Sequence, residues 1–350
     1  MIYICLKNVH NLFFFVDNCL YVIYTKRKCN IYKQVMNKIL VYIVNMSITF
    51  LCGVAFYLYN IYFIIQNDSI VKIRGGISVS QIVKDLKKDK ILNVFNEKVF
   101  LRFIDGKMLA GHYKVFKGEK IWELAKRIRD GKSEMCFITF VPGKTVYQYI
   151  EQINSDDNFY GIVKNIPPEG YIMPESYKHK CQTSREFVVN YAQNSMQKLV
   201  DLLIDGYDFE KSHLKSKFDV LIMASIIEKE TGVLEEMPKI SSVFRNRMKI
   251  GMKLQTDPTV IYQVSGETGI LGRKLILEDL KSVGAWNTYV VNGLPLTPIA
   301  SPSREAIIAA LNPESNDYIF FVASGFGGHV FSKTYKEHLK NVEKYREIIG

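Results

Sequence analysis

A glutamate closes an apolar helical stretch in the second half of the chain. Residues 218–231 read FDVLIMASIIEKET, and helical spacing places Leu221 and Ser225 on the face of Glu228. A carboxyl group at the end of an apolar face is partly desolvated, which favours the protonated form that a general acid needs. Glu228 is therefore a candidate acid/base catalyst. Helical spacing does not clearly separate it from Glu230, and the alternative is a surface glutamate paired with a neighbouring lysine.

Three loop-like stretches on either side of this helix combine polar side chains with glycine and proline: residues 169–177, 251–259 and 287–295. Loops of this kind often carry binding residues on a rigid scaffold. The candidate substrate-binding residues on them are Glu169, Gln255, Asp257, Asn287 and Tyr289. For each, the alternative is a structural role in bracing its own loop.

The elements that must position these loops form a larger region, residues 144–350, that is predicted to be mainly helical. Helices are predicted at 144–153, 185–203, 218–231, 238–250, 257–263, 303–311 and 334–348. Strands are predicted at 318–323 and 330–331, with loops at 166–177, 251–258 and 292–303.

A smaller unit, residues 66–143, is predicted to mix short strands and helices. Strand-like stretches occur at 70–73, 110–115 and 137–141. A helix capped by Ser78 or Ser80 follows the first strand, and a second helix ends at Gly131. The fold class expected for the exterior part of the chain is therefore α+β.

Residues 39–65 form an uncharged apolar stretch, long enough to cross about 30 Å of hydrocarbon as a helix. Basic residues precede it and no acid lies between Asp17 and Asp68, so the positive-inside rule predicts a cytoplasmic N-terminus (residues 1–38) and an exterior remainder. We read the stretch as an uncleaved single-pass anchor. Met36 directly before it resembles a natural start, which predicts that residues 1–35 are a start-site artefact.

Composition excludes global disorder, because 48% of the residues are hydrophobic and 13% aromatic. The net charge is +11, and outside the N-terminal region no Lys/Arg run with interleaved aromatics indicates a nucleic-acid partner. No cysteine spacing fits a metal site, and His329 and His338 are not spaced like ligands, so they are interpreted as structural or rim residues and no metal or cofactor is predicted. Cys136 and Cys181 either pair or stay as free thiols.

Five motifs together resemble the YceG-like (MltG) family of endolytic murein transglycosylases. They are EGYIMPESY (169–177), ASIIEKETG (224–232), VFRNRMKIGMKLQTDPTVIY (243–262), WNTYVVNGLPLTPIASPS (286–303) and GGHVFSKTYKEH (327–338). Their order and spacing agree with the family over most of residues 165–340. The chain departs from the family in loop details, such as Pro142-Gly143-Lys144 where a Pro-Glu-Gly turn is usual.

The resemblance implies a membrane anchor, a small LysM-like subdomain and a larger YceG-like catalytic domain, with Glu228 as the catalytic residue. It implies cleavage of the β-1,4 bond between N-acetylmuramic acid and N-acetylglucosamine in nascent strands, leaving 1,6-anhydro ends and terminating elongation. The implied partners are peptidoglycan glycan strands, the membrane and cell-wall synthases, at the bacterial inner membrane with the catalytic domain outside. The alternatives are a water-using muramidase, with Asp257 or Glu169 as a second carboxylate, and a non-catalytic wall-binding or scaffold protein.

Overall fold

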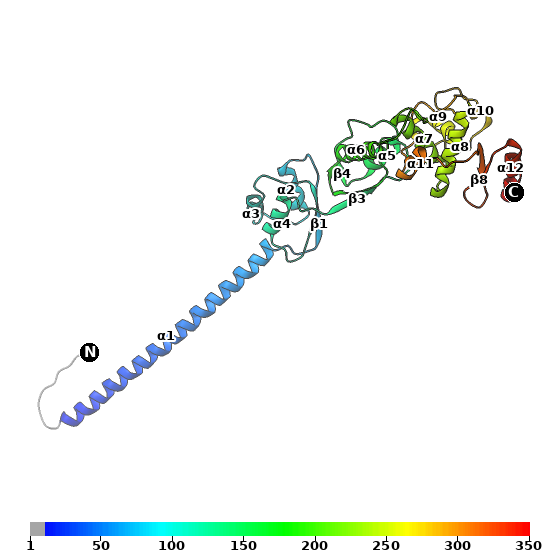
Figure 1. The fold of residues 1–350 in the computed structure, drawn as a ribbon. Coiled ribbons are helices and arrows are strands. Elements are labelled where there is room, and N and C mark those ends of the chain that lie inside the picture. The colour runs from blue at the N-terminus through cyan, green and yellow to red at the C-terminus, as the bar shows by residue number, and fades with distance from the viewer. Residues whose placement is uncertain (1–10) are drawn as a thin grey trace.

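The computed structural model describes residues 11–350, and it arranges them as a long helix followed by two folded parts (Figure 1). Residues 1–10 of the predicted cytoplasmic N-terminus lie outside the described residues. The prediction that residues 1–35 are a start-site artefact falls partly on these residues and stays a prediction.

Helix α1 (Asn11–Phe63) stands clear of the rest of the molecule in Figure 1. Its part Asn30–Phe63 contains an 18-residue window with a mean hydropathy of 2.2 that is not buried against protein, so the helix is long and apolar enough to cross a membrane. The predicted span at 39–65 lies in this helix except at its end. The helix stops at Phe63 because the backbone of Ile65 donates to Glu119, 2.9 Å away, and the Ile65 side chain enters the core of the next unit.

The first folded part is a small α+β unit directly after α1. Its two strands pair antiparallel, from Ser69 opposite Val115 to Ile73 opposite Gly111. Its elements are β1 (Ser69–Ile73), α2 (Val79–Lys88), α3 (Glu97–Ile104), β2 (Gly111–Val115) and α4 (Ile121–Arg129). Ser78 caps α2, as predicted, by accepting from the Gln81 amide. Helix α3, which the sequence analysis missed, buries only Phe100 and Ile104 fully and is too short for a clear periodic signal.

The second part begins with β3 (Met135–Thr139), which pairs antiparallel with β5 (Ser176–Lys180). A disulfide between Cys136 and Cys181 joins this pair, so the two cysteines left open by the sequence analysis are bonded. The strand β5 overlaps the end of the predicted loop at 166–177. The predicted division after residue 143 stays a prediction, although Ile138 packs in one core with elements that follow it.

The remainder is mainly helical, in agreement with the predicted α+β class. Its helices are α5 (Val146–Ser155), α6 (Arg185–Leu203), α7 (Lys217–Glu230), α8 (Met237–Lys249), α9 (Asp257–Ser265), α10 (Leu277–Leu280), α11 (Arg304–Leu311) and α12 (Tyr335–Ile349). Its remaining strands are the parallel pair β4 (Phe159–Tyr160) and β6 (Thr183–Ser184) and the antiparallel pair β7 (Phe320–Ala323) and β8 (His329–Ser332).

Helix α7 is the centre of the largest core. Its eight consecutive residues from Val220 to Ile227 are each at most 3% exposed, because α8 and α11 pack around it. A helix that is apolar on all sides is enclosed by other elements. The surrounding elements therefore fix the position of α7, including its polar C-terminal residues Glu228–Glu230.

Candidate functional site

Glu228 lies where α7 leaves the core. It follows the buried run, is itself half-buried, and precedes the exposed Lys229. The helix ends two residues later because Thr231 adopts an extended backbone. The rigid helix thus presents one carboxyl group at the boundary between protein interior and solvent.

The carboxyl group of Glu228 is held by Ser303. The backbone amide of Ser303 donates to Oε2 of Glu228 over 2.9 Å, and the Ser303 hydroxyl donates to the same oxygen. Ser303 is the N-cap of α11, and its hydroxyl also accepts from the Ala306 amide. Among the residues that the structure describes, Oε1 of Glu228 has no hydrogen-bond partner in the protein. The side chain is therefore oriented through one oxygen while the other stays available.

The segment that carries Ser303 is itself fastened to α7. The Ile299 amide donates to the Ser225 hydroxyl over 3.1 Å, and Ser225 is one helical turn before Glu228 and fully buried. The loop 292–303 and the catalytic candidate are thus tied together at two points of one helix face.

A turn at Gly143 lies beside the Glu228 side chain. Its amide donates to the Ser301 carbonyl over 3.0 Å, and its carbonyl accepts from Nζ of Lys229. A Cβ at this position would lie 3.7 Å from Cγ of Glu228, and the φ of +77° favours glycine. The backbone can therefore approach Glu228 without a side chain that covers it.

Glu169 lies in the same region and binds backbone. Its Oε1 accepts from the amides of Val146 and Gly170 over 3.0 and 3.2 Å. Burial raises the pKa of Glu169 to about 7, although these donors act in the opposite direction. The buried Tyr149 lies near both carboxyl groups. Burial is the main cause that raises the pKa of Tyr149, and the charges of Glu169 and Glu228 raise it further. Glu169 therefore pins the loop 166–177 to the start of α5.

Three predicted substrate-binding residues lie near the start of α9. Gln255 is exposed, with a left-handed φ of +49°, and its amide donates to the Thr288 carbonyl. Asp257 is exposed and accepts from the Tyr289 hydroxyl over 2.7 Å. The structure thus brings Asp257 and Tyr289 together and leaves Gln255 beside them facing solvent.

Asn287, by contrast, is fully buried. Its side-chain amide donates to the carbonyls of Leu280 and Ser282 over 3.0 and 2.8 Å, and its Oδ1 accepts from the Tyr289 amide. These bonds complete the loop between α10 and Tyr289. These contacts fit the bracing role that was the alternative for Asn287, and its role in substrate binding stays a prediction.

A buried polar cluster that the sequence analysis did not identify lies behind Glu228. Burial, followed by the charge of Asp257, raises the pKa of Glu230 to about 8, while Arg247 lowers it. Arg247 is 7% exposed and donates to the carbonyls of Ile319 and Leu254. The sequence does contain a signal for Arg247. It occupies the buried face of α8 after Ile240, Val243 and Phe244, at a position where helical spacing predicts an apolar residue.

The two C-terminal histidines are engaged with protein. Nδ1 of His329 lies 2.9 Å from Oε2 of Glu236. Oε1 of the same carboxylate accepts from the backbone amide of His329. His338 stacks on Phe320. Within residues 30–350, the side chains that come together as a metal site would are His112, Cys136 and Cys181, and the disulfide occupies both sulfurs.

Comparison with known proteins gives a family match over most of the chain. The family model of the YceG-like family matches residues 71–344. The chain is similar to an endolytic murein transglycosylase of Bacillus subtilis strain 168, with 31% identity over 79% of this chain and 84% of the relative.

Two further proteins are similar to this chain over different shares of their own length. An endolytic murein transglycosylase of Streptococcus pneumoniae strain R6 is 30% identical over 51% of this chain and 32% of its own length. A crystal structure of a YceG-like protein from Listeria monocytogenes is 28% identical, covers 78% of this chain and 98% of that one, and has a TM-score of 0.49.

Proposed function

The chain belongs to the YceG-like family, and we propose that it is an endolytic lytic transglycosylase of peptidoglycan with Glu228 as its acid and base. The observation that carries this proposal is the asymmetric hold on one carboxyl group. Ser303 donates twice to Oε2, while Oε1 has no partner among the described residues. When Glu228 is protonated, Oε2 can accept as the carbonyl oxygen and Oε1 can carry the proton toward the substrate.

The proposed reaction needs only this carboxyl group. Protonated Glu228 gives its proton to the oxygen that links N-acetylmuramic acid to N-acetylglucosamine, and the bond from that oxygen to C1 of the muramyl sugar breaks. The Glu228 carboxylate then takes the proton of the muramyl 6-hydroxyl. At the same time the oxygen of that hydroxyl bonds to C1 of the same sugar. The products are a 1,6-anhydro-muramyl end and a free N-acetylglucosamine 4-hydroxyl, and Glu228 is protonated again.

The contacts of the other candidate carboxylates favour this reaction over the water-using one. A hydrolase needs a second carboxylate that activates water or acts as a nucleophile. Glu169 is bound to two backbone amides, and Asp257 is bound to Tyr289.

A hollow of about 760 Å³ beside Lys144 supports binding of a polar polymer. Lys144 follows Gly143, so this hollow begins next to the backbone that faces Glu228. Its lining is rich in amides and includes Gln148, Gln152 and Asn154, groups that pair with sugar hydroxyls. A glycan strand in this hollow would reach Glu228 from the side of α5.

We also propose that α1 anchors the chain in the inner membrane, with the folded parts outside. Basic residues before the apolar span support this orientation. The disulfide supports it as well, since such bonds persist in extracytoplasmic compartments. This placement would put Glu228 beside nascent strands and cell-wall synthases, where a cut ends elongation.

The test is mass spectrometry of products from the full chain in detergent, incubated with uncrosslinked glycan strands. We expect internal cuts with 1,6-anhydro ends, lost in Glu228→Gln and kept in Glu235→Gln, which alters an exposed glutamate nearby. Reducing ends would show a muramidase instead, and binding without any cleavage would show a wall-binding protein. Full activity in Glu228→Gln would remove this residue from the mechanism.

A further inference from the structure

A second cavity lies beside the middle of α7, next to the connection between α6 and α7. It has a volume of about 300 Å³ and is enclosed by the α6–α7 connection, the C-terminal half of α8 and the end of α11. Met223 of α7 contributes to it, five residues before Glu228. No residue of this cavity takes part in the proposed cleavage.

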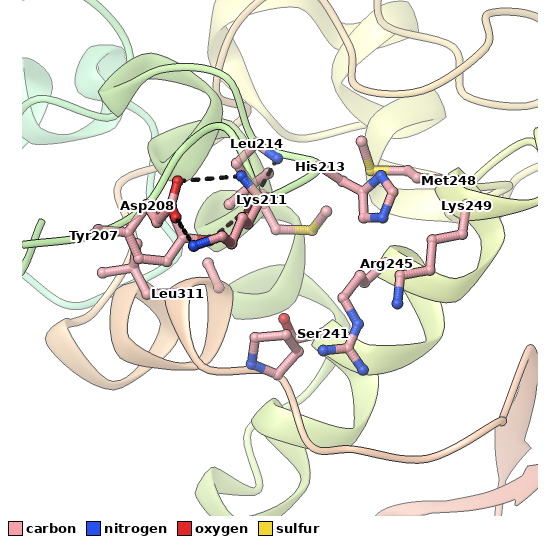
Figure 2. Close-up of a pocket in the computed structure, with 14 residues that line it drawn as sticks. Tyr207, Asp208, Lys211, His213, Leu214, Ser241, Arg245, Met248, Lys249 and Leu311 are labelled. Atoms are coloured by element: carbon pink, nitrogen blue, oxygen red, sulfur yellow. Dashed lines mark hydrogen bonds and ion pairs between the residues drawn. The ribbon is translucent and has the colours of Figure 1, made fainter.

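The cavity carries an excess of positive charge. Its cations are Lys211, Arg245 and Lys249, and its one carboxylate, Asp208, already pairs with Lys211 over 2.8 Å. Figure 2 shows that ion pair on one side of the cavity and Arg245, Lys249 and His213 on the other. Lys249 has no ion pair with any residue that the structure describes.

Arg245 in particular is incompletely paired. One terminal nitrogen donates to the Glu314 carbonyl over 2.9 Å, but the buried Nε has no partner within the described part of the chain. A buried donor without a partner costs free energy, and Nε is shielded from the cavity. The other terminal nitrogen also has no hydrogen-bond partner among the described residues, and an anionic ligand would supply its acceptor. The positive potential also reaches His213, whose pKa is lowered by burial and by Lys249, Lys215 and Arg245.

The floor of the cavity is apolar. It is formed by side chains of Leu214, Met223 and Leu311. An anion without an apolar part, such as a free phosphate, would leave these apolar side chains without a contact. A lipid chain would not fit into the volume of the cavity. The ligand that matches both parts is a short peptide end, with a free carboxylate beside a small apolar side chain.

We propose that this cavity binds the carboxylate end of the short peptides carried by the glycan strands. The inference rests on the proposed function, because that function supplies strands with peptides attached. Arg245 and Lys249 would hold the carboxylate, and the apolar floor would hold the adjacent methyl groups. The site would thus select strands whose peptides are still uncrosslinked and end freely.

The binding test uses calorimetry of the full chain in detergent with N-acetylated Lys-D-Ala-D-Ala, its C-terminal amide, and inorganic phosphate. We expect the acid to bind, the amide to bind at least tenfold more weakly, and the acid to lose about tenfold in affinity in Arg245→Gln and Lys249→Gln. Lys198→Gln, at an exposed lysine on α6, should bind like the unchanged chain. Lys249 is exposed, so its variant tests the proposal even if Arg245→Gln fails to fold.

Equal binding of acid and amide, or unchanged binding in both cavity variants, would overturn the proposal. So would binding of phosphate alone, which would indicate a phosphate-bearing ligand. Cleavage separates this inference from the proposed function: in Lys249→Gln, KM should rise for strands with peptides and stay unchanged for bare strands. Peptide binding without any cleavage would retain the site and reject the proposed function.

Discussion

The amide and the hydroxyl of Ser303 both donate to a single carboxylate oxygen of Glu228. Because Ser303 also begins α11, the first turn of that helix and the end of α7 are locked to one another. The positive end of the α11 dipole lies at this oxygen and stabilises the carboxylate that remains after proton transfer. One serine therefore joins the packing of two core helices to the orientation of the proposed acid.

Ser303→Ala tests this link. It removes the hydroxyl donor and keeps the amide donor, so the Glu228 side chain should lose part of its orientation. A hydrogen bond to a charged group contributes about 1.5–3 kcal/mol, which predicts a fall in kcat of about 10- to 100-fold. The measurement is the rate of strand cleavage, with Ser303→Thr as the matched control because threonine keeps the hydroxyl and the cap.

Loss of the cap also predicts a lower stability of Ser303→Ala, by about 1 kcal/mol. Urea unfolding at the assay temperature separates this effect from the effect on kcat. If kcat stays within twofold of the unchanged chain while the protein is folded, the hydroxyl has no role in orienting Glu228.

Most helices could be predicted from the sequence because their signals are local. Helix α6 was predicted with its observed bounds, Arg185–Leu203, since an apolar face repeats along it. Strand β5 was not predicted, because its partner β3 lies about 40 residues away and the loop motif around it is rich in proline and glycine. The partner strand β3 overlaps the stretch predicted at 137–141, but pairing over such a separation left no local signal in β5.

The candidate site shows the same difference between local signals and contacts of distant segments. Glu228 could be named as a candidate from the apolar stretch before it and from the family resemblance, and its catalytic role stays a prediction. Ser303 could not be predicted as its partner, because the local pattern around Ser303 indicates only a helix cap. Glu230 could not be separated from Glu228 by spacing, and the structure distinguishes them by neighbours: Glu228 faces Ser303, whereas Glu230 shares a buried cluster with Arg247.

Replacement of Arg247 is expected to be severely destabilising. Arg247→Met would leave the carbonyls of Ile319 and Leu254 without their donor and Glu230 without its nearby cation. Each buried carbonyl left without its donor costs about 1–3 kcal/mol, so the two together predict a loss of about 2–6 kcal/mol. Urea unfolding measures this loss, and Arg346→Met, at an exposed position of α12, is the control. A loss below about 1 kcal/mol would show that the cluster contributes little.

Loss of the disulfide should be visible under oxidising conditions only. Cys136 and Cys181 are 45 residues apart, and closing such a loop stabilises the folded state by about 4 kcal/mol in the chain-entropy account. The Cys136→Ser/Cys181→Ser variant should have a lower Tm than the unchanged chain without reductant, and reductant should remove the difference. Cys52→Ser, at the exposed cysteine of α1, should behave like the unchanged chain. Equal Tm values without reductant would contradict the expected contribution.

Glu169 should make stability fall with rising pH. Burial raises its pKa in the folded state to about 7, above the usual 4.5, so the folded state holds a proton that the unfolded state releases. Its contribution is fully present below pH 4.5 and is lost as pH rises through 7. The shift corresponds to about 3 kcal/mol.

Glu169→Gln cannot titrate, so its stability relative to the unchanged chain should rise by about this amount between pH 4.5 and 8. Urea unfolding at closely spaced pH values measures the difference, and Glu175→Gln, at an exposed glutamate of the same loop, should show no such trend. A difference that stays constant with pH would mean that Glu169 remains charged in the folded chain. The amides of Val146 and Gly170 would then outweigh the burial of the carboxyl group, and the loop 166–177 would be held by a permanent anion.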